Sequence, residues 1–291
     1  MHSPLRVAQV ACYRELIDEV KGPGVLDVCW RQEPDKAVRG LWASSDGCLQ
    51  LTKAFSIDTL GASLTGHDSF LVERDCIAMA CDMSVREGKL TAAMSSGTIG
   101  IVDISSGTVQ GVKGHSSEAW TVTFDPHNDQ LLFSGGDDGC WKCWDMRDSA
   151  KSLFSNSWHT AGVCSIQPHS VNPERLVTGS YDKRIALWDR RNLQTPLHFL
   201  DRAAESGIWK LRWHPSGDFR VLAACMYDGF YVYNLAAPRS QEPSESDRRA
   251  GVEATYDPKD LSYGCAWLNS STALTCSFYN HQMQIWSVNS E

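Results

Sequence analysis

The stretch SGGDDGCWKCWD, from Ser134 to Asp145, recurs as TGSYDKRIALWD, from Thr178 to Asp189, at an offset of 44 residues. Both copies begin with a small hydroxyl residue, carry an aspartate near the middle and end in Trp-Asp. A fixed period of roughly 40–45 residues that closes on Trp-Asp is typical of a β-propeller blade. Such a blade is a four-stranded sheet, and several blades stand radially around a channel. The sequence therefore predicts an all-β propeller.

Each copy also has a histidine upstream, so four side chains recur together. In a blade the aspartate can accept a hydrogen bond from the histidine, the histidine can bond the hydroxyl, and the hydroxyl can meet the indole N–H. Buried polar groups need such partners, and a connected chain of them fixes a turn and a strand register. We therefore interpret both histidines as structural. The predicted tetrads are His115, Ser134, Asp138 and Trp144, and His159, Thr178, Asp182 and Trp188.

Weaker copies of the repeat extend over most of the chain. Each follows a short apolar segment and has lost part of the tetrad, which blade packing tolerates while apolar burial remains. In CSFYNHQMQIW, near the C-terminus, Cys276, Asn280 and Trp286 keep spacings of 10 and 6 residues. Three further copies run from Trp42 to Thr52, from Ala92 to Asp103 and from Ala223 to Asn234. We count six readable blades of a WD-repeat propeller.

One further apolar strand, Val7 to Tyr13, precedes the first readable blade, which begins near Val25. In one interpretation it pairs with the last blade and closes a six-bladed ring, which removes exposed edges. In the other it is the outer strand of a further N-terminal blade whose first three strands are missing. We thus divide the chain into an N-terminal strand and lead-in, 1–24, and a propeller, 25–291. A loop rich in Pro, Ser and charge, 236–251, is expected to be mobile.

Composition argues against several classes of partner. The 291-residue chain has a net charge of −8 and no cluster of Lys and Arg, so we expect no nucleic-acid partner. The N-terminal residues do not resemble a signal peptide, and no stretch is long enough to cross a membrane. The 11 cysteines are odd in number, which favours reduced thiols inside the cell. Cys140 and Cys143 would point to opposite faces of a strand and could not share a metal.

None of the common catalytic motifs, such as G-x-S-x-G or H-E-x-x-H, is present. In a propeller, the loop before each inner strand and the loop between the second and third strands emerge on one face, where ligands can bind. His281 stands where the better repeats have Gly139 or Lys183, so the tetrad does not explain it. The first kind of loop supplies Glu118, Trp120, His159, Glu205, Trp209 and Tyr263, and the second supplies Tyr181, Met226, Tyr227, Phe278, Tyr279 and His281.

Seven segments in this order carry a resemblance to a known family: EAWTVTF, FSGGDDG, HTAGVCSIQ, VTGSYDKRIALWDRRN, GIWKLRWHP, LAACMYDGF and CSFYNHQMQIW. The chain from about Val25 to Ser287 resembles the WD-repeat diphthine methylesterases, also called diphthine methyltransferases, of eukaryotic diphthamide biosynthesis. The resemblance implies hydrolysis of the methyl ester of methylated diphthine on translation elongation factor two. It also implies other proteins of this pathway as partners, a cytoplasmic location and no cofactor. Family members usually carry another blade before the region matching Val25, which favours the missing-blade interpretation.

Ester hydrolysis needs an activated water or nucleophile, a base, and donors for the oxyanion. We hypothesise that His281 is the base and that Glu118 or Glu205 assists it. Cys225 and Cys276 are candidate nucleophiles, but both lie in segments expected to be buried. The aromatic residues expected to bind substrate are Trp120, Trp209, Tyr263, Tyr181, Tyr227 and Tyr279, and no metal site is predicted.

A second hypothesis comes from another class of protein. WDMR, ending at Arg147, and WDRR, ending at Arg191, match the W-D-x-R pattern of propeller substrate receptors of cullin-type ubiquitin ligases. Both arginines follow a third strand, where a guanidinium can emerge to meet an adaptor. Arginine is also common in such solvated turns, so a scaffold without chemistry is a third interpretation.

Overall fold

The computed structural model describes residues 7–8, 23–32, 38–52, 55–58, 61–64, 67–84, 86, 88–148, 151–236, 251–280 and 282–288. All regular elements in these ranges are β-strands. No helix in the described ranges is long and apolar enough to span a membrane. The chain forms two compact units. We call Arg14–Ser157 the N-terminal unit, and Met1–Tyr13 together with Trp158–Glu291 the C-terminal unit.

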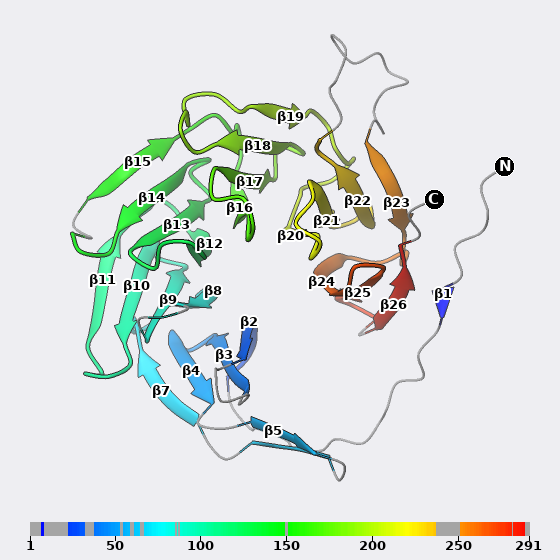
Figure 1. Ribbon diagram of the computed structural model, residues 1–291. Helices are drawn as coiled ribbons and strands as arrows, with labels where there is room; N and C mark the ends of the chain where they lie inside the picture. Colours follow the sequence, from blue (N-terminus) through cyan, green and yellow to red (C-terminus); the bar gives the residue numbers. More distant parts are fainter. Residues whose placement is uncertain are drawn as a thin grey trace, which may run out of the picture. The chain divides into compact units, whose positions relative to one another are not determined.

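The N-terminal unit contains three antiparallel sheets, which are the first three blades (Figure 1). The first comprises β2 (Val25–Gln32), β3 (Val38–Ser44), β4 (Cys48–Thr52) and β7 (His67–Leu71). The second comprises β8 (Ala78–Met83), β9 (Lys89–Met94), β10 (Thr98–Asp103) and β11 (Val109–Lys113). The third comprises β12 (Ala119–Phe124), β13 (Leu131–Gly136), β14 (Trp141–Asp145) and β15 (Ser152–Asn156). The repeat did not predict the extra hairpin of β5 (Phe55–Asp58) and β6 (Gly61–Leu64), which pairs with β3.

The C-terminal unit contains the fourth, fifth and sixth blades (Figure 1). The fourth comprises β16 (Val163–Pro168), β17 (Arg175–Ser180), β18 (Ile185–Asp189) and β19 (His198–Leu200). The fifth comprises β20 (Lys210–Trp213), β21 (Arg220–Ala224), β22 (Phe230–Asn234) and β23 (Val252–Tyr256). The sixth contains β24 (Ser262–Asn269), β25 (Thr272–Ser277) and β26 (Met283–Ser287). Most of the loop expected at 236–251 lies outside the described residues.

The N-terminal strand β1 (Val7–Ala8) is the fourth strand of the sixth blade. Val7 pairs with Trp286 and Ala8 with Ile285, in antiparallel register. The strand therefore pairs with the last blade, as the first of the two interpretations requires. The remaining residues of the predicted strand, 9–13, lie outside the described residues.

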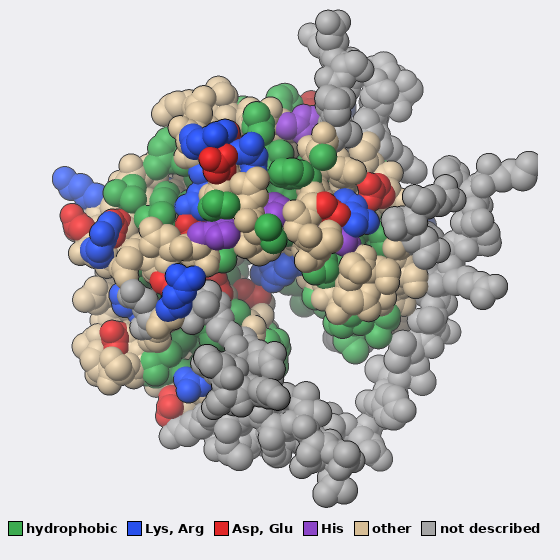
Figure 2. Space-filling model, viewed as in Figure 1, with side chains coloured by type: hydrophobic (Ala, Val, Ile, Leu, Met, Phe, Trp, Pro, Cys, Tyr) green, Lys and Arg blue, Asp and Glu red, His purple; other side chains and the backbone are tan. Residues whose placement is uncertain are grey.

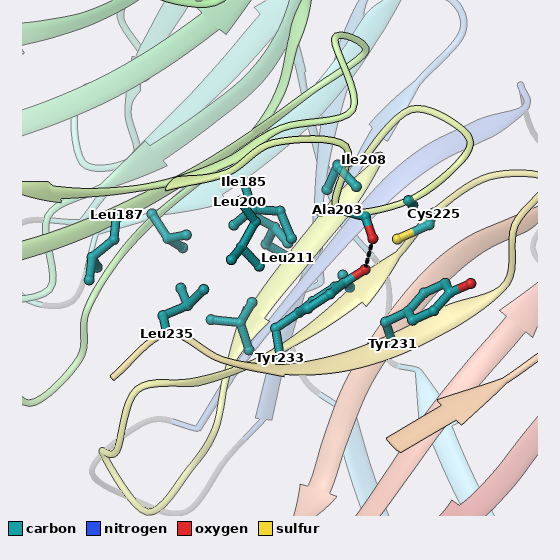
Figure 3. Packing of buried hydrophobic residues seen from close by; sticks show 14 residues of the cluster. Ile185, Leu187, Leu200, Ala203, Ile208, Leu211, Cys225, Tyr231, Tyr233 and Leu235 are labelled. Carbon is teal, nitrogen blue, oxygen red and sulfur yellow. Dashed lines mark hydrogen bonds between the residues drawn. The ribbon is translucent and has the colours of Figure 1, made fainter. Parts of the chain in front are cut away.

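Blades pack face to face because their central strands are apolar on both sides. In the fourth blade, β17 and β18 are buried almost throughout, whereas the outermost strands β11 and β15 of other blades are largely exposed. Figure 3 shows the core between the fourth and fifth blades, to which Ile185, Leu211 and Tyr233 contribute fully buried side chains. Each such side chain contributes about 1.5–3 kcal/mol of burial. Similar clusters join the first blade to the second, the second to the third, and the fifth to the sixth.

The first predicted tetrad is present as a buried hydrogen-bonded chain in the third blade. The Trp144 indole N–H donates to Ser134 Oγ at 2.9 Å, and Ser134 Oγ lies 2.8 Å from His115 Nε2. His115 Nδ1 lies 3.0 Å from a carboxylate oxygen of Asp138. The carboxylate can only accept, so Nδ1 carries the proton and the serine hydroxyl donates to Nε2.

The second tetrad repeats this chain in the fourth blade. His159 Nδ1 lies 2.8 Å from Asp182 Oδ2, and His159 Nε2 lies 2.8 Å from Thr178 Oγ1. The indole of Trp188 donates to the same hydroxyl at 2.9 Å. Both tetrads thus join the start of a blade to the turn before its third strand.

We expect the first tetrad to make stability depend on pH. Burial of the ring lowers the pKa of His115 below its ordinary 6.5, and this outweighs the opposing influence of Asp138. As the pH falls, His115 therefore binds a proton more readily in the unfolded chain than in the folded chain. The contribution of His115 to the free energy of unfolding is thus fully present above pH 6.5 and decreases below it. Hydrogen bonds from His115 and the Ser116 N–H lower the pKa of Asp138 despite burial, so its contribution is lost only below about pH 3.8. Urea unfolding at pH 7.5 and 5.5 should show a smaller loss of stability in His115→Gln than in the parent; equal losses would contradict the assignment.

The sixth blade departs from the predicted repeat by one residue. Trp286 donates to Thr275 Oγ1 at 3.2 Å, so Thr275, and not Cys276, holds the hydroxyl position. Cys276 was expected to be buried in its strand but is exposed. The turn after β25 is one residue longer than its counterparts, and for this reason the spacing of the repeat pointed to the wrong residue. Pro258 stands four residues before β24, where the tetrad blades have histidine.

Candidate functional site

Aromatic side chains from three blades of the C-terminal unit form a continuous row. At its centre the rings of Trp209 and Tyr263 lie 4.6 Å apart between centroids, inclined by 36°. Tyr181 approaches Trp209 at 6.1 Å and 78° from the fourth blade. On the other side Phe278 approaches Tyr263 at 5.5 Å and 45°. Three blades therefore contribute to one surface.

The row ends in a pair of tyrosines. Tyr279 lies 5.2 Å from Phe278, with the ring planes at 90°. Tyr227, from the fifth blade, forms a side-chain hydrogen bond with Tyr279, which is the chief reason that the pKa of Tyr227 is raised. Its hydroxyl therefore stays protonated at neutral pH. We call the complete set the aromatic row, and its members are Tyr181, Trp209, Tyr263, Phe278, Tyr279 and Tyr227.

Two repeat positions supply five of these six rings. Tyr181, Tyr227 and Tyr279 each stand directly before the Asp or Asn of the turn between the second and third strands of their blades. Trp209 directly precedes β20, and Tyr263 is the second residue of β24. The same two positions in successive blades lie side by side, and for this reason the rings meet.

Much of the aromatic row is accessible to solvent. Tyr227, Tyr279 and Phe278 expose 69%, 64% and 52% of their surface, whereas Trp209 and Tyr263 are half-buried. Figure 2 shows hydrophobic side chains, in green, at the surface over the sheet of β24–β26. Large exposed apolar groups that gather in this way mark sites of binding.

The backbone beneath the row is tightly held. Met226 adopts φ of 47°, a left-handed conformation uncommon for a residue with a side chain. Its carbonyl accepts a hydrogen bond from the Ser262 N–H at 2.7 Å, which ties the Tyr227 turn to the start of β24. A Cβ on Gly207 would lie 2.8 Å from the Tyr181 ring and 3.2 Å from the Met226 sulfur. Glycine at this position therefore lets the fourth and fifth blades approach.

Acidic side chains brace the same turns. Asp228 Oδ2 accepts the Glu205 N–H at 2.8 Å, which brings the exposed Glu205 to the turn that carries Tyr227. Asp260 Oδ2 accepts the Asn280 N–H at 2.7 Å, next to Tyr279. Two carboxylates thus fix the loops between which the rings lie.

The other predicted site residues lie elsewhere. Glu118 and Trp120 belong to the N-terminal unit, where the Trp120 indole donates to Asp137 at 3.2 Å. His159 is a tetrad residue and is buried. His281 lies outside the described residues, so its role as base stays a prediction from sequence.

Four buried histidines use both ring nitrogens in hydrogen bonds within the fold. His115 and His159 do so in the tetrads. The Nδ1 atom of His169 accepts the Val171 N–H, and its Nε2 faces the Asp218 carbonyl. His214 bonds Ser216 and the Ser270 carbonyl. Because both ring nitrogens are engaged within the fold, we assign a structural role to all four histidines.

Neither candidate cysteine has the properties of an activated nucleophile. Cys225 is fully buried, and burial raises the pKa of its thiol well above the ordinary value. Cys276 is exposed, yet desolvation also raises its pKa. The Cys276 sulfur lies over Gly264 on the paired strand, and a hydrogen bond with the Gly264 backbone lowers this pKa without offsetting the desolvation. Cys140 precedes β14 and is half-buried, while Cys143 lies in that strand and is buried.

No group of three or more His, Cys, Asp and Glu side chains in the described ranges is arranged to hold a metal ion.

Comparisons with known proteins agree with this architecture. The family model "WD domain, G-beta repeat" matches residues 107–145 and 150–189, the two blades with complete tetrads. A chain in the crystal structure of the mitotic checkpoint complex superposes with a TM-score of 0.68 at 17% identity, covering 92% of this chain and 76% of that one. This likeness concerns the fold alone. The predicted WD-repeat β-propeller is confirmed.

Relatives of known name are also similar to this chain in sequence. The human diphthine methyltransferase is 33% identical over 259 residues, which cover 84% of this chain and 55% of the human protein. The diphthine methyltransferase homolog of Dictyostelium discoideum is 26% identical, covering 90% of this chain and 76% of the relative. The chain thus spans about half the length of its human relative. The family resemblance is confirmed: the chain is a WD-repeat β-propeller protein similar in sequence to the diphthine methyltransferases.

Proposed function

We propose that the protein hydrolyses the methyl ester of methylated diphthine on translation elongation factor two, a step in diphthamide biosynthesis. The observation that carries this proposal is the aromatic row with Glu205 beside it, in a chain similar to diphthine methyltransferases. A cytoplasmic location belongs to the proposal.

The reaction adds water to the ester carbonyl and releases methanol, leaving a carboxylate. A base must take a proton from the water, and a donor must meet the oxygen on which negative charge develops. His281 is our candidate for the base, with Glu205 assisting. The Tyr227 hydroxyl is our candidate for the donor, since it is exposed and a tyrosine keeps its proton at neutral pH. Glu118, in the other unit, stays a second candidate for the assisting carboxylate.

The direct test is incubation of the purified protein with elongation factor two that bears methylated diphthine. We expect methanol release and loss of one CH₂ from the modified peptide, measured by mass spectrometry. Elongation factor that lacks the methyl ester is the control and should not change. An unchanged mass of the methylated peptide at stoichiometric enzyme would contradict the proposal.

The ubiquitin-ligase receptor is the alternative function, and its two arginines have a local explanation. Arg147 is bound by both carboxylate oxygens of Asp145, at 2.9 Å from Nε and 2.5 Å from Nη2. Arg191 is bound by Asp189 in the same way. These pairs close the turn after the third strand and need no adaptor. Arg147→Ala combined with Arg191→Ala should leave demethylation intact, whereas loss of an adaptor complex in this variant would favour the receptor.

A further inference from the structure

The aromatic row has the chemistry of a cation site. The face of an aromatic ring is electron-rich and attracts cations, above all bulky quaternary ammonium groups that are weakly hydrated. Rings at large angles to one another can contact such a group from more than one side. Tyr181 and Trp209 are inclined by 78°, and Phe278 and Tyr279 by 90°, whereas a purely stacked row would offer one flat face.

The charges around the row agree with a cationic ligand. Asp260 acts electrostatically on Tyr227, and Asp228 and Glu205 lie in the adjoining turn. Two basic residues of these loops are matched by carboxylates of their own. Lys259 pairs with Asp257 at 2.5 Å, and Arg184 pairs with Asp201 at 2.7 Å.

We propose that the aromatic row binds the quaternary ammonium group of the substrate side chain. The inference rests on the proposed function, since diphthine is a histidine derivative that carries a trimethylammonium group. The row would hold this group while the methyl ester on the same carbon chain meets the catalytic residues. It thereby supplies specificity for the trimethylated side chain over its less methylated forms, whose N–H groups are more strongly hydrated.

The test compares choline with 3,3-dimethylbutan-1-ol, a neutral molecule of nearly the same shape. Each is titrated into the whole protein with isotope-labelled aromatic residues, at constant ionic strength, and the ring resonances are followed by NMR. We expect choline to shift the signals of Trp209 and Tyr279 with an affinity about tenfold higher than that of the neutral isostere. Equal affinity of the two molecules, or no shift with choline, would overturn the inference.

Variants locate the site. Tyr279→Leu removes an exposed ring and should not disturb folding, so it should weaken choline binding by about tenfold. Phe199→Leu is the matched control, because Phe199 is an exposed aromatic on β19 that packs on Trp158, outside the row. An equal loss in both variants would contradict the assignment.

Failure of this inference and failure of the proposed function can be told apart. Choline binding that depends on Tyr279, in a protein that does not demethylate the elongation factor, would support the ammonium site and contradict the hydrolase. Demethylation with an unchanged KM in Tyr279→Leu would support the hydrolase and overturn the ammonium site.

Discussion

Replacement of Asp182 by alanine is expected to lower the free energy of unfolding by about 2–4 kcal/mol. The Asp182 side chain is only 3% exposed, and it accepts from His159 Nδ1 and from the N–H groups of Thr160 and Arg184. Alanine leaves the fully buried His159 ring without its partner, whereas the exposed Thr160 N–H can bind water instead. Without this partner His159 is less firmly oriented, and its hydrogen bond with Thr178 is weakened. The strand register of the blade is then less firmly fixed. The measurement is urea unfolding at pH 7.5.

The chain offers a matched control for this variant. Asp228 lies in the corresponding turn of the fifth blade, but there the carboxylate accepts from the Glu205 N–H and not from a tetrad histidine. Asp228→Ala should therefore cost about 1 kcal/mol, the scale of a single hydrogen bond. Asp138→Ala should behave like Asp182→Ala, because the first tetrad repeats the second. A loss in Asp182→Ala no larger than in Asp228→Ala would show that the tetrad does not stabilise the fold as a unit.

Replacement of His281 by alanine is expected to lower the rate of demethylation by a factor on the order of 10² or more, the scale of losing a general base. Stability should change little, because no tetrad partner explains this histidine. The measurement is methanol release under saturating methylated elongation factor.

The control is His198→Ala, a histidine on the strand β19. It should retain the activity of the parent. If His281→Ala kept the rate of the parent, the base would have to be sought elsewhere, with Glu205 the next residue to replace.

The blades and tetrads could be predicted because their signal is local. His115, Asp138 and Trp144 lie in one blade, and their spacing repeats as that blade repeats. The same logic failed in the sixth blade, where one additional residue in a turn moved the hydroxyl from Cys276 to Thr275. The β5–β6 hairpin was missed because it is inserted within the first blade and leaves the spacing of the later blades unchanged.

The aromatic row could be predicted only as a set of residues and not as a contact. Trp209 and Tyr263 are 54 residues apart, and their rings meet because two successive blades place the same repeat position side by side. A sequence signal for this existed, since Tyr181, Tyr227 and Tyr279 each directly precede the Asp or Asn of the turn in three successive copies. No pattern in the sequence indicated which of these rings are exposed to solvent. None indicated that Met226 has a left-handed backbone conformation.

The additional residue after β25 bears on how such a protein diverges after duplication of its repeats. In the third and fourth blades an insertion at this point would pull the aspartate away from its histidine, so selection against unfolding holds the turn length constant. In the sixth blade Pro258 replaces that histidine, and a longer turn breaks no network. This longer turn carries both Phe278 and Tyr279. The sixth blade, which lacks the network, thus contributes three rings to the aromatic row, whereas the fourth blade, which keeps it, contributes Tyr181 alone.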